Sequence, residues 1–537
     1  MSGLTVPRTE TVLRNSTREV VSVRRFGADP NRADNTGPIQ AAIAAVPEGT
    51  ILNIPAEDYH VPSWSSWDLA KSLIIQCDGR LIGDGGNFLQ CKPGSSLIIE
   101  GGGFENWNIP IRVELPVNTL SLTGVHFKDC NRAIWDDNAG ETNGAMERLL
   151  VSRCTFEDME RYGILLRTGK IQHGLIENSI FRNIGDNLEG TKAAIQVGEV
   201  SASEDEPVGR IIIQGNTIDG VTTTSSSEQC RGILATSKFV MIRNNYLHNV
   251  LGGMGNADNE AIYTKGLFST IDGNTVVNCS RGEACLVIKG SSRETDPVNG
   301  SFGSRITNNT VIARDGFVPS TYAIRVSGSD AIVEGNQVEN WSQGIEISGD
   351  YNWVRNNRLR LNANNSDGKQ AVRLVRSSNI LIENNECPGM GENGGNEMFL
   401  RIRLECQNIV VRANTVDMAS GSGGAVLIQA DPGDEVKDIE IIGNKFLGNV
   451  RSGLNWSGDG TVSDVVWENN QDNGYDWYEI RDTLYPVVRR GTISGTGSPE
   501  GVVAAPVGTI YIRVDGGADT TLYVKESGTG NTGWVAK

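Results

Sequence analysis

The sequence predicts an all-β fold, a right-handed single-stranded parallel β-helix in which short strands build one coil after another. Ten segments of alternating apolar residues each lead into an asparagine, and the mean step between these asparagines is about 28 residues. They are Asn216, Asn245, Asn274, Asn309, Asn336, Asn357, Asn385, Asn414, Asn444 and Asn470. A period of two is typical of strands and not of helices. A repeat of this length with several strands is one turn of a β-solenoid.

Each recurring asparagine is expected at a corner between two strands. Asparagine tolerates left-handed backbone, and its side-chain amide can bond to the equivalent amide one coil away. Ordinary loop asparagines would not recur at similar steps, so the series predicts a continuous ladder along the β-helix.

The chain divides into three predicted parts. Residues 1–49 form an N-terminal segment with a short capping helix at Thr36–Ala45. Residues 50–485 form the parallel β-helix. Residues 486–537 break the repeat and are expected to hold two or three antiparallel strands, as an oligomerisation or tail-associated element.

Charge and composition exclude several classes of partner. The formal net charge is −17, and duplex nucleic acid is excluded as a partner because phosphate binding needs clustered Lys and Arg. The first twenty residues contain no apolar core of a signal peptide, and no run of roughly 18 apolar residues predicts a membrane span. Nine cysteines are spread singly without a C-x-x-C pair, so we expect small buried side chains.

One wall of the predicted β-helix carries a candidate site. Four segments align on the glycine that ends each strand: AIYTKG, CLVIKG, AIRVSG and GIEISG. Alternate residues, such as Ile262 and Thr264, are expected to point inward. Lys265, Lys289 and Arg325 are expected to point outward as a basic column, with coils about 4.8 Å apart. Like charges on adjacent strands are unfavourable unless an anion joins them, so the column predicts an acidic ligand.

Oxygen-bearing side chains surround the start of this wall. Asn245, Asp258 and Glu260 are ligand types that Ca²⁺ prefers, although such residues also line solvated corners without a metal. Tyr263, Glu346 and His248 complete the predicted substrate-binding residues.

Both ends of the chain resemble known proteins. F-G-A-D, D-N-T and Q-A-A-I within residues 26–43 are similar to the N-terminal cap of pectate-lyase-superfamily β-helices, which phage tailspikes and secreted lyases share. P-E-G, Y-V-K-E-S-G and T-G-W near the C-terminus are similar to an element of phage tail and appendage proteins. The resemblance implies a virion tail protein, with secretion as the alternative. It also implies a homotrimer and contacts with phage tail proteins.

Residues 240–336 resemble polysaccharide lyase family 6, which contains the alginate lyases and chondroitinase B. The shared features are Asp-x-Glu-x-x-x-x-Lys after an Asn corner and a basic residue before glycine one coil later. The implied Ca²⁺ ligands are Asn245, Asp258 and Glu260. The resemblance further implies Lys265 as general base and Lys289 or Arg325 near the leaving group. The R-H-G setting of the family is absent, since this position reads Ile288-Lys289-Gly290.

The leading prediction is therefore a depolymerase that cleaves an acidic, uronate-containing bacterial polysaccharide by β-elimination. A glycoside hydrolase is the alternative, with Glu346 paired with Asp330 or Asp350. A glycan-binding spike without catalysis is the third reading.

Overall fold

The computed structural model describes the chain apart from its first 17 residues and a set of internal segments. The internal residues not described are 137–144, 168–170, 186–189, 199–208, 224, 226, 238, 254–258, 280–283, 290–300, 315, 318, 320–321, 362–368, 390–396, 419–423, 449–451, 473–487, 491, 504, 506 and 529.

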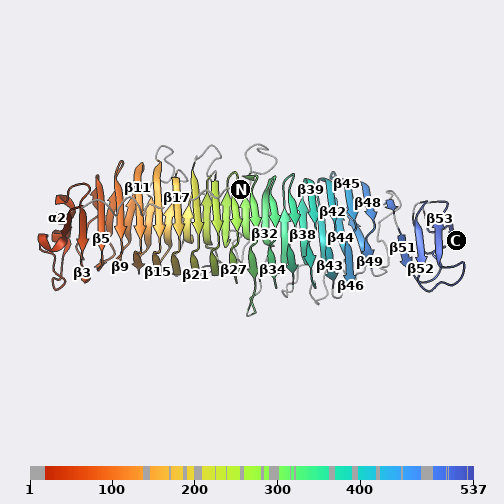
Figure 1. The fold of residues 1–537 in the computed structure, drawn as a ribbon, viewed down its shortest axis with the longest axis horizontal. Helices are drawn as coiled ribbons and strands as arrows, with labels where there is room; N and C mark the ends of the chain where they lie inside the picture. The colour runs from red at the N-terminus through yellow and green to blue at the C-terminus, as the bar shows by residue number, and fades with distance from the viewer. Residues whose placement is uncertain are drawn as a thin grey trace.

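Three long parallel sheets run along one axis, and each coil visits them in the order A, B, C (Figure 1). Sheet A contains β1 (Val20–Ser22), β2 (Ile51–Ile54), β5 (Ser72–Cys77), β8 (Ser96–Glu100), β11 (Val117–Thr123), β14 (Met146–Ser152), β17 (Ile171–Glu177), β20 (Arg210–Gln214), β23 (Phe239–Arg243), β26 (Thr270–Asp272), β30 (Arg305–Thr307), β33 (Ile332–Glu334), β36 (Trp353–Arg355), β39 (Ser378–Glu383), β42 (Cys406–Arg412), β45 (Glu435–Ile442), β48 (Thr461–Glu468) and β50 (Val488–Arg490).

Sheet B contains β3 (Asp58–His60), β6 (Arg80–Ile82), β9 (Gly103–Glu105), β12 (His126–Lys128), β15 (Thr155–Met159), β18 (Ile180–Ile184), β21 (Thr217–Thr222), β24 (Tyr246–Leu251), β27 (Thr275–Val277), β31 (Thr310–Ile312), β34 (Gln337–Glu339), β37 (Arg358–Arg360), β40 (Glu386–Cys387), β43 (Thr415–Met418), β46 (Lys445–Gly448) and β49 (Gln471–Asp472).

Sheet C contains β4 (Trp67–Leu69), β7 (Asn87–Cys91), β10 (Ile109–Val113), β13 (Arg132–Asp136), β16 (Tyr162–Leu166), β19 (Lys192–Val197), β22 (Cys230–Thr236), β25 (Ile262–Lys265), β28 (Ala284–Lys289), β32 (Tyr322–Ser329), β35 (Gln343–Ile347), β38 (Gln370–Val375), β41 (Met398–Arg403), β44 (Gly424–Gln429) and β47 (Ser452–Ser457), and β29 (Ser301–Phe302) pairs with the end of β32. These three sheets confirm the predicted parallel β-helix.

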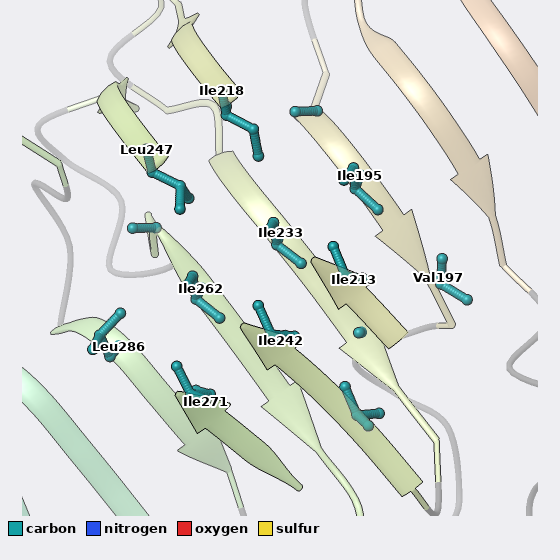
Figure 2. Close-up of a cluster of buried hydrophobic side chains, with 14 of the residues drawn as sticks. Ile195, Val197, Ile213, Ile218, Ile233, Ile242, Leu247, Ile262, Ile271 and Leu286 are labelled. Carbon is teal, nitrogen blue, oxygen red and sulfur yellow. The ribbon is translucent and has the colours of Figure 1, made fainter. Parts of the chain in front are cut away.

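The interior is filled by the inward-pointing aliphatic and aromatic side chains of the three sheets, which align in columns from one coil to the next. Figure 2 shows Ile213 of sheet A, Leu247 of sheet B and Ile262 of sheet C pointing toward one another between the sheets. Near the N-terminal end the same interior column of sheet B is aromatic, and Phe156 stacks on Phe181 with ring centroids 4.5 Å apart. Each fully buried side chain of this size stabilises the fold by about 1.5–3 kcal/mol relative to exposure.

The predicted asparagine ladder is continuous from Asn216 to Asn470 at the corner between sheets A and B. In each step the side-chain oxygen of one asparagine accepts the backbone N–H and the amide N–H of the asparagine one coil before it. The left-handed residue is not the ladder asparagine but the one before it, for example Asn244 with φ 53°. This corrects the expected role, because the strained position and the bonding position are separate residues.

The two ends differ from the coils between them. Helix α2 (Thr36–Ala45) has the predicted bounds, and the 3₁₀ helix η1 (Val23–Phe26) lies beside it. At the other end, β51 (Thr492–Gly495), β52 (Ile510–Arg513), β53 (Leu522–Lys525) and β54 (Trp534–Ala536) form a separate sheet (Figure 1). Three of these strands are antiparallel as predicted, and β51 is an additional parallel strand.

All nine cysteines are free and buried, as predicted from their single spacing. Burial raises the pKa of the Cys91 thiol to about 12. Within the described part of the chain, no helix is both long and apolar enough to cross a membrane.

Candidate functional site

The predicted wall is the outer face of sheet C. Tyr263 aligns with Val287, Arg325 and Glu346 on successive strands, which confirms the alignment of the four glycine-ended segments. The side chains expected to point inward, Ile262 and Thr264 among them, are fully buried. The period of two therefore assigns the faces of these strands correctly.

The predicted three-residue basic column is wrong in its third member. Lys265 aligns with Lys289, and the next residue in that column is Ser327. Arg325 lies two residues earlier, in the adjacent outward column that begins at Tyr263. Residues i and i+2 share a face of a strand but occupy different columns, so the basic surface is two columns wide.

A cluster of charged residues surrounds Glu346 on this face. One carboxylate oxygen of Glu346 is 2.9 Å from Nε of Arg325, and the other is 3.2 Å from Nη1 of Arg373. The Glu346 side chain is 9% exposed, whereas those of Arg325 and Arg373 are 23% and 19% exposed. The two arginine side chains are thus more exposed than the carboxylate between them, although the Nε atoms of both are buried.

Tyr322 extends this cluster toward the neighbouring outward column. Its hydroxyl accepts a hydrogen bond of 2.9 Å from Nη1 of Arg373, and the guanidinium carbon of Arg373 lies 5.9 Å from the ring centroid. Burial raises the pKa of Tyr322, and the hydrogen bond from Arg373 opposes that rise. Tyr322 therefore fixes the orientation of Arg373.

Two further arginines, Arg401 and Arg403, lie on the next strand, β41. Arg373 pairs in register with Arg401, and Arg401 donates a hydrogen bond to Gln429. Burial lowers the pKa of Arg401, and the positive charges of Arg373 and Arg403 lower it further. We call Arg325, Glu346, Arg373, Arg401 and Arg403 the Glu346 cluster, in which Arg325 and Arg373 share the Glu346 carboxylate and Arg401 and Arg403 add two guanidinium groups on the next strand.

Sequence reasoning missed Tyr322, Arg373, Arg401 and Arg403. The signal was present, because AVRLVRS and FLRIRLE repeat the apolar and basic alternation of the four aligned segments. The alignment ended at Gly349 because the two later strands are not closed by glycine.

Glu260 and Tyr263 lie at the N-terminal side of the same face. Glu260 forms a 2.9 Å ion pair with Arg231, and both side chains are 5% exposed. Arg231 also lies over the ring of Tyr263, which is buried in an outer apolar patch. That patch comprises Leu234, Tyr263, Ala284, Val287 and Tyr322. Both predicted residues therefore contribute to packing and ion pairing on the outer face of sheet C.

The two described members of the predicted calcium site, Asn245 and Glu260, already interact with other side chains of the protein. The side-chain oxygen of Asn245 accepts two hydrogen bonds from Asn216, and its amide nitrogen donates to Asn274 and to the Ile213 carbonyl. Asn245 is therefore a ladder residue, which corrects the predicted ligand role. Asp258 lies outside the described residues. Among the residues described, no group of three His, Cys, Asp or Glu side chains could hold a metal.

The structure places His248 on β24 in sheet B, away from the outer face of sheet C. Its Nδ1 atom is 2.9 Å from Oδ1 of Asp219, and its side chain is partly exposed. His248 is therefore not brought together with Lys265, Glu346 or Arg325.

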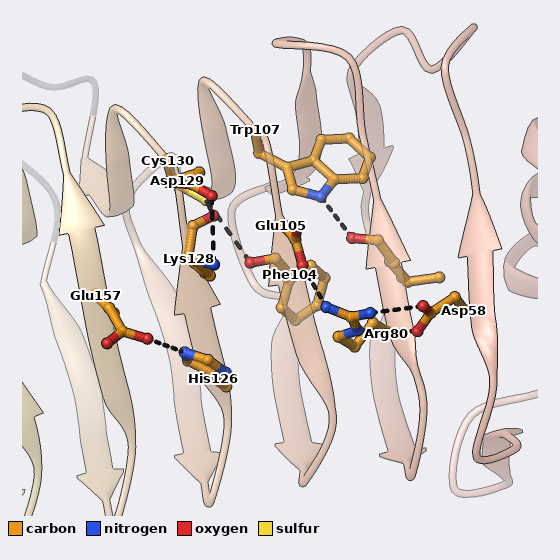
Figure 3. A network of polar contacts seen from close by, with 11 residues as sticks. Asp58, Arg80, Phe104, Glu105, Trp107, His126, Lys128, Asp129, Cys130 and Glu157 are labelled. Carbon is orange, nitrogen blue, oxygen red and sulfur yellow. Dashed lines mark hydrogen bonds and ion pairs between the residues drawn. The ribbon is translucent and has the colours of Figure 1, made fainter.

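The charges on sheet B follow a different pattern from those on sheet C. Figure 3 shows Arg80 between Asp58 and Glu105, with nitrogen to oxygen distances of 2.6 Å to each. His126 approaches Glu157 at 3.4 Å on the same sheet. On sheet B the single cation Arg80 contacts two carboxylates, whereas in the Glu346 cluster two guanidinium groups contact one carboxylate.

Comparison with known proteins agrees with the fold. Residues 297–472 match the family model described as the right handed beta helix region. The fold is a right-handed parallel β-helix. No curated protein sequence matches the chain.

Solved structures similar to the chain share little sequence with it. The surface protein and adhesin PfbA of Streptococcus pneumoniae has 14% identity and a TM-score of 0.33, covering 71% of this chain and 99% of that chain. A tailspike protein mutant of E. coli bacteriophage HK620 in complex with pentasaccharide has 13% identity and a TM-score of 0.30, covering 84% and 66%. The Family 28 exopolygalacturonase of Yersinia enterocolitica has 13% identity and a TM-score of 0.30, covering 83% and 79%. With TM-scores this low, the similarities support no conclusion about function.

Proposed function

We propose that the outer face of sheet C binds an acidic, uronate-containing polysaccharide and that the protein cleaves it by β-elimination. The observation that carries this proposal is the Glu346 cluster. Two guanidinium groups share the Glu346 carboxylate and two more lie on the adjacent strand β41, in a chain with a net charge of −17. Guanidinium groups bind carboxylates with two parallel hydrogen bonds, which suits a polymer with one carboxylate per uronate unit.

The elimination uses the two outward columns together. An arginine paired with the uronate carboxylate withdraws charge and makes the C5 proton more acidic. Lys265 takes that proton as the general base, the C4–O bond breaks, and a C4–C5 double bond forms. The leaving oxygen takes a proton from Lys289 or from water. Lys265 and Lys289 support these roles because they are paired in register next to the column of Arg325.

Hydrolysis is the second candidate and has less support. It needs two carboxyl groups, one of which protonates the leaving oxygen. Glu346 contacts Arg325 with one oxygen and Arg373 with the other, so neither oxygen is directed at a substrate. Asp350 accepts a hydrogen bond from the Ser378 backbone at the corner between sheets C and A.

Three parts of the proposal extend beyond this site. Ca²⁺ dependence, a homotrimeric state and attachment to phage tail proteins remain predictions from the sequence. The first is tested by adding a chelator to the cleavage assay, and the second by light scattering during size-exclusion chromatography. Binding without cleavage would indicate a glycan-binding spike.

Binding to immobilised polygalacturonate tests the role of the arginines. We expect the double variant Arg401→Gln, Arg403→Gln to bind at least about tenfold more weakly at low salt, because charge-assisted hydrogen bonds contribute about 1.5–3 kcal/mol each. The affinity should also depend less steeply on salt concentration.

The matched control is Arg358→Gln, Arg360→Gln. These arginines have the same spacing on β37 of sheet B, and their side chains are about half exposed. Both double variants change the net charge equally, so a general loss of positive charge would weaken both alike. Equal affinities for the two variants would contradict the proposed binding face.

A further inference from the structure

A second group of arginines and aromatic rings lies on the outer face of sheet C, on three successive strands nearer the N-terminus. Arg112 on β10 pairs in register with Trp135 on β13, and Arg132 on β13 pairs with Tyr162 on β16. Arg161 precedes Tyr162 directly. We call Arg112, Arg132, Trp135, Arg161 and Tyr162 the Trp135 cluster. Strands β19, β22, β25 and β28 separate it from the Glu346 cluster.

Aromatic rings hold the guanidinium groups of this cluster in place. The guanidinium carbons of Arg112 and Arg132 lie 5.1 Å and 4.9 Å from the Trp135 ring centroid. The guanidinium carbon of Arg161 lies 5.7 Å from the Tyr162 ring centroid. A guanidinium group stacked on a ring keeps its N–H edge available for hydrogen bonds.

Within the described residues, no carboxylate forms an ion pair with Arg132 or Arg161. The Nε atoms of both residues are buried without a hydrogen-bond partner there. The nearby Glu114 is 2.7 Å from the amino group of Lys92, and Asp136 points into the interior. Among the described residues, the two arginines therefore lack the ion pairs with carboxylates that Arg80 forms on sheet B.

The positive charges of the cluster change the pKa values of residues within it. Burial lowers the pKa of Arg132, and the positive charge of Arg161 lowers it further. Burial raises the pKa of Tyr162, and the charges of Arg161 and Arg132 oppose that rise. Uncompensated, partly buried cations are unfavourable unless a ligand supplies the opposite charge.

We infer that the Trp135 cluster is a second anion-binding site, which takes the carboxylate group of a uronate sugar. The N–H edges of Arg132 and Arg161 form hydrogen bonds to the carboxylate, and Trp135 and Tyr162 hold both guanidinium groups in position. The choice of a uronate over other carboxylates rests on the proposed function, because both clusters lie on the same face of sheet C.

Fluorine NMR of protein labelled with 5-fluorotryptophan tests this site directly. The chain has 10 tryptophans, and the Trp135 signal is assigned by its loss in Trp135→Phe. We expect trigalacturonate to shift the Trp135 signal in a saturable way. The shift should vanish in the double variant Arg132→Gln, Arg161→Gln. It should persist in the double variant Arg401→Gln, Arg403→Gln. The double variant Arg132→Lys, Arg161→Lys keeps both positive charges but lacks the planar guanidinium group. It should bind trigalacturonate at least about tenfold more weakly than the unchanged protein.

Three results would overturn the inference. The first is a Trp135 signal that does not shift with trigalacturonate. The second is a shift that persists in the double variant Arg132→Gln, Arg161→Gln. The third is an equal shift with potassium sulfate, which would indicate a non-selective anion site. Maltotriose, a neutral trisaccharide, serves as the ligand control. If the Trp135 signal does not shift but the protein still produces unsaturated uronates, only this inference is contradicted. If the Trp135 signal shifts but no unsaturated uronates form, the proposed cleavage is contradicted and the second binding site is supported.

Discussion

Replacement of Asn309 by alanine is expected to lower the free energy of unfolding by about 3–5 kcal/mol. Asn309 is fully buried in the middle of the ladder and makes four side-chain hydrogen bonds. Its oxygen accepts from the backbone and the amide of Asn274, and its amide donates to the Ile271 carbonyl and to Asn336. A buried polar group left without a partner costs about 1–3 kcal/mol.

The matched control is Asn470→Ala at the last rung of the ladder. Asn470 is only half-buried and receives the same two hydrogen bonds from Asn444, so water can replace the lost amide. We expect this variant to lose about 1 kcal/mol. Thermal unfolding followed by circular dichroism compares the two midpoints. Equal midpoints would contradict the view that the buried ladder stabilises the coils.

Replacement of Lys265 by alanine is expected to reduce the rate of polysaccharide cleavage by about 10²–10⁴-fold, the usual contribution of a general base. Lys265 lies on the outer face of sheet C beside Lys289. The Glu346 cluster begins on β32, two strands along the sheet from Lys265, and is unchanged in this variant, so affinity for the polymer should fall by less than about threefold. A large effect on kcat with a small effect on KM would identify loss of chemistry and not of binding.

Lys445→Ala controls for the loss of one lysine. Lys445 is exposed on β46 in sheet B, outside the proposed site. Cleavage by this variant should match that of the unchanged protein. Full activity of Lys265→Ala would show that another group removes the proton, and the nearby Tyr322 would then be the next residue to substitute.

The fold could be predicted from the sequence because its determinants recur at each coil. Every ladder asparagine repeats the same local environment, so the column from Asn216 to Asn470 is visible without any tertiary information. Inward positions follow from the alternation of side chains along each strand. The capping helix at Thr36–Ala45 was predictable from local signals at its two ends, Asn35 before it and Pro47 after it.

The site could be predicted only in part, because the register between neighbouring strands decides which of its residues lie side by side. Arg325 and Lys289 are both outward, but only strand pairing shows that they occupy different columns. Asn245 fits both a metal motif and the ladder, and its place in the repeated column decides between them. The contacts of Glu260 with Arg231 join residues 29 positions apart, a distance that no local motif reveals.

The most direct test of the central claim is the ultraviolet absorbance of unsaturated uronates during digestion of a panel of uronate polysaccharides. Elimination creates a C4–C5 double bond in each new non-reducing end, and hydrolysis does not. We expect the absorbance to rise with at least one polymer and this rise to be lost in Lys265→Ala. New reducing ends without any rise in absorbance would contradict β-elimination and show that the protein is a hydrolase.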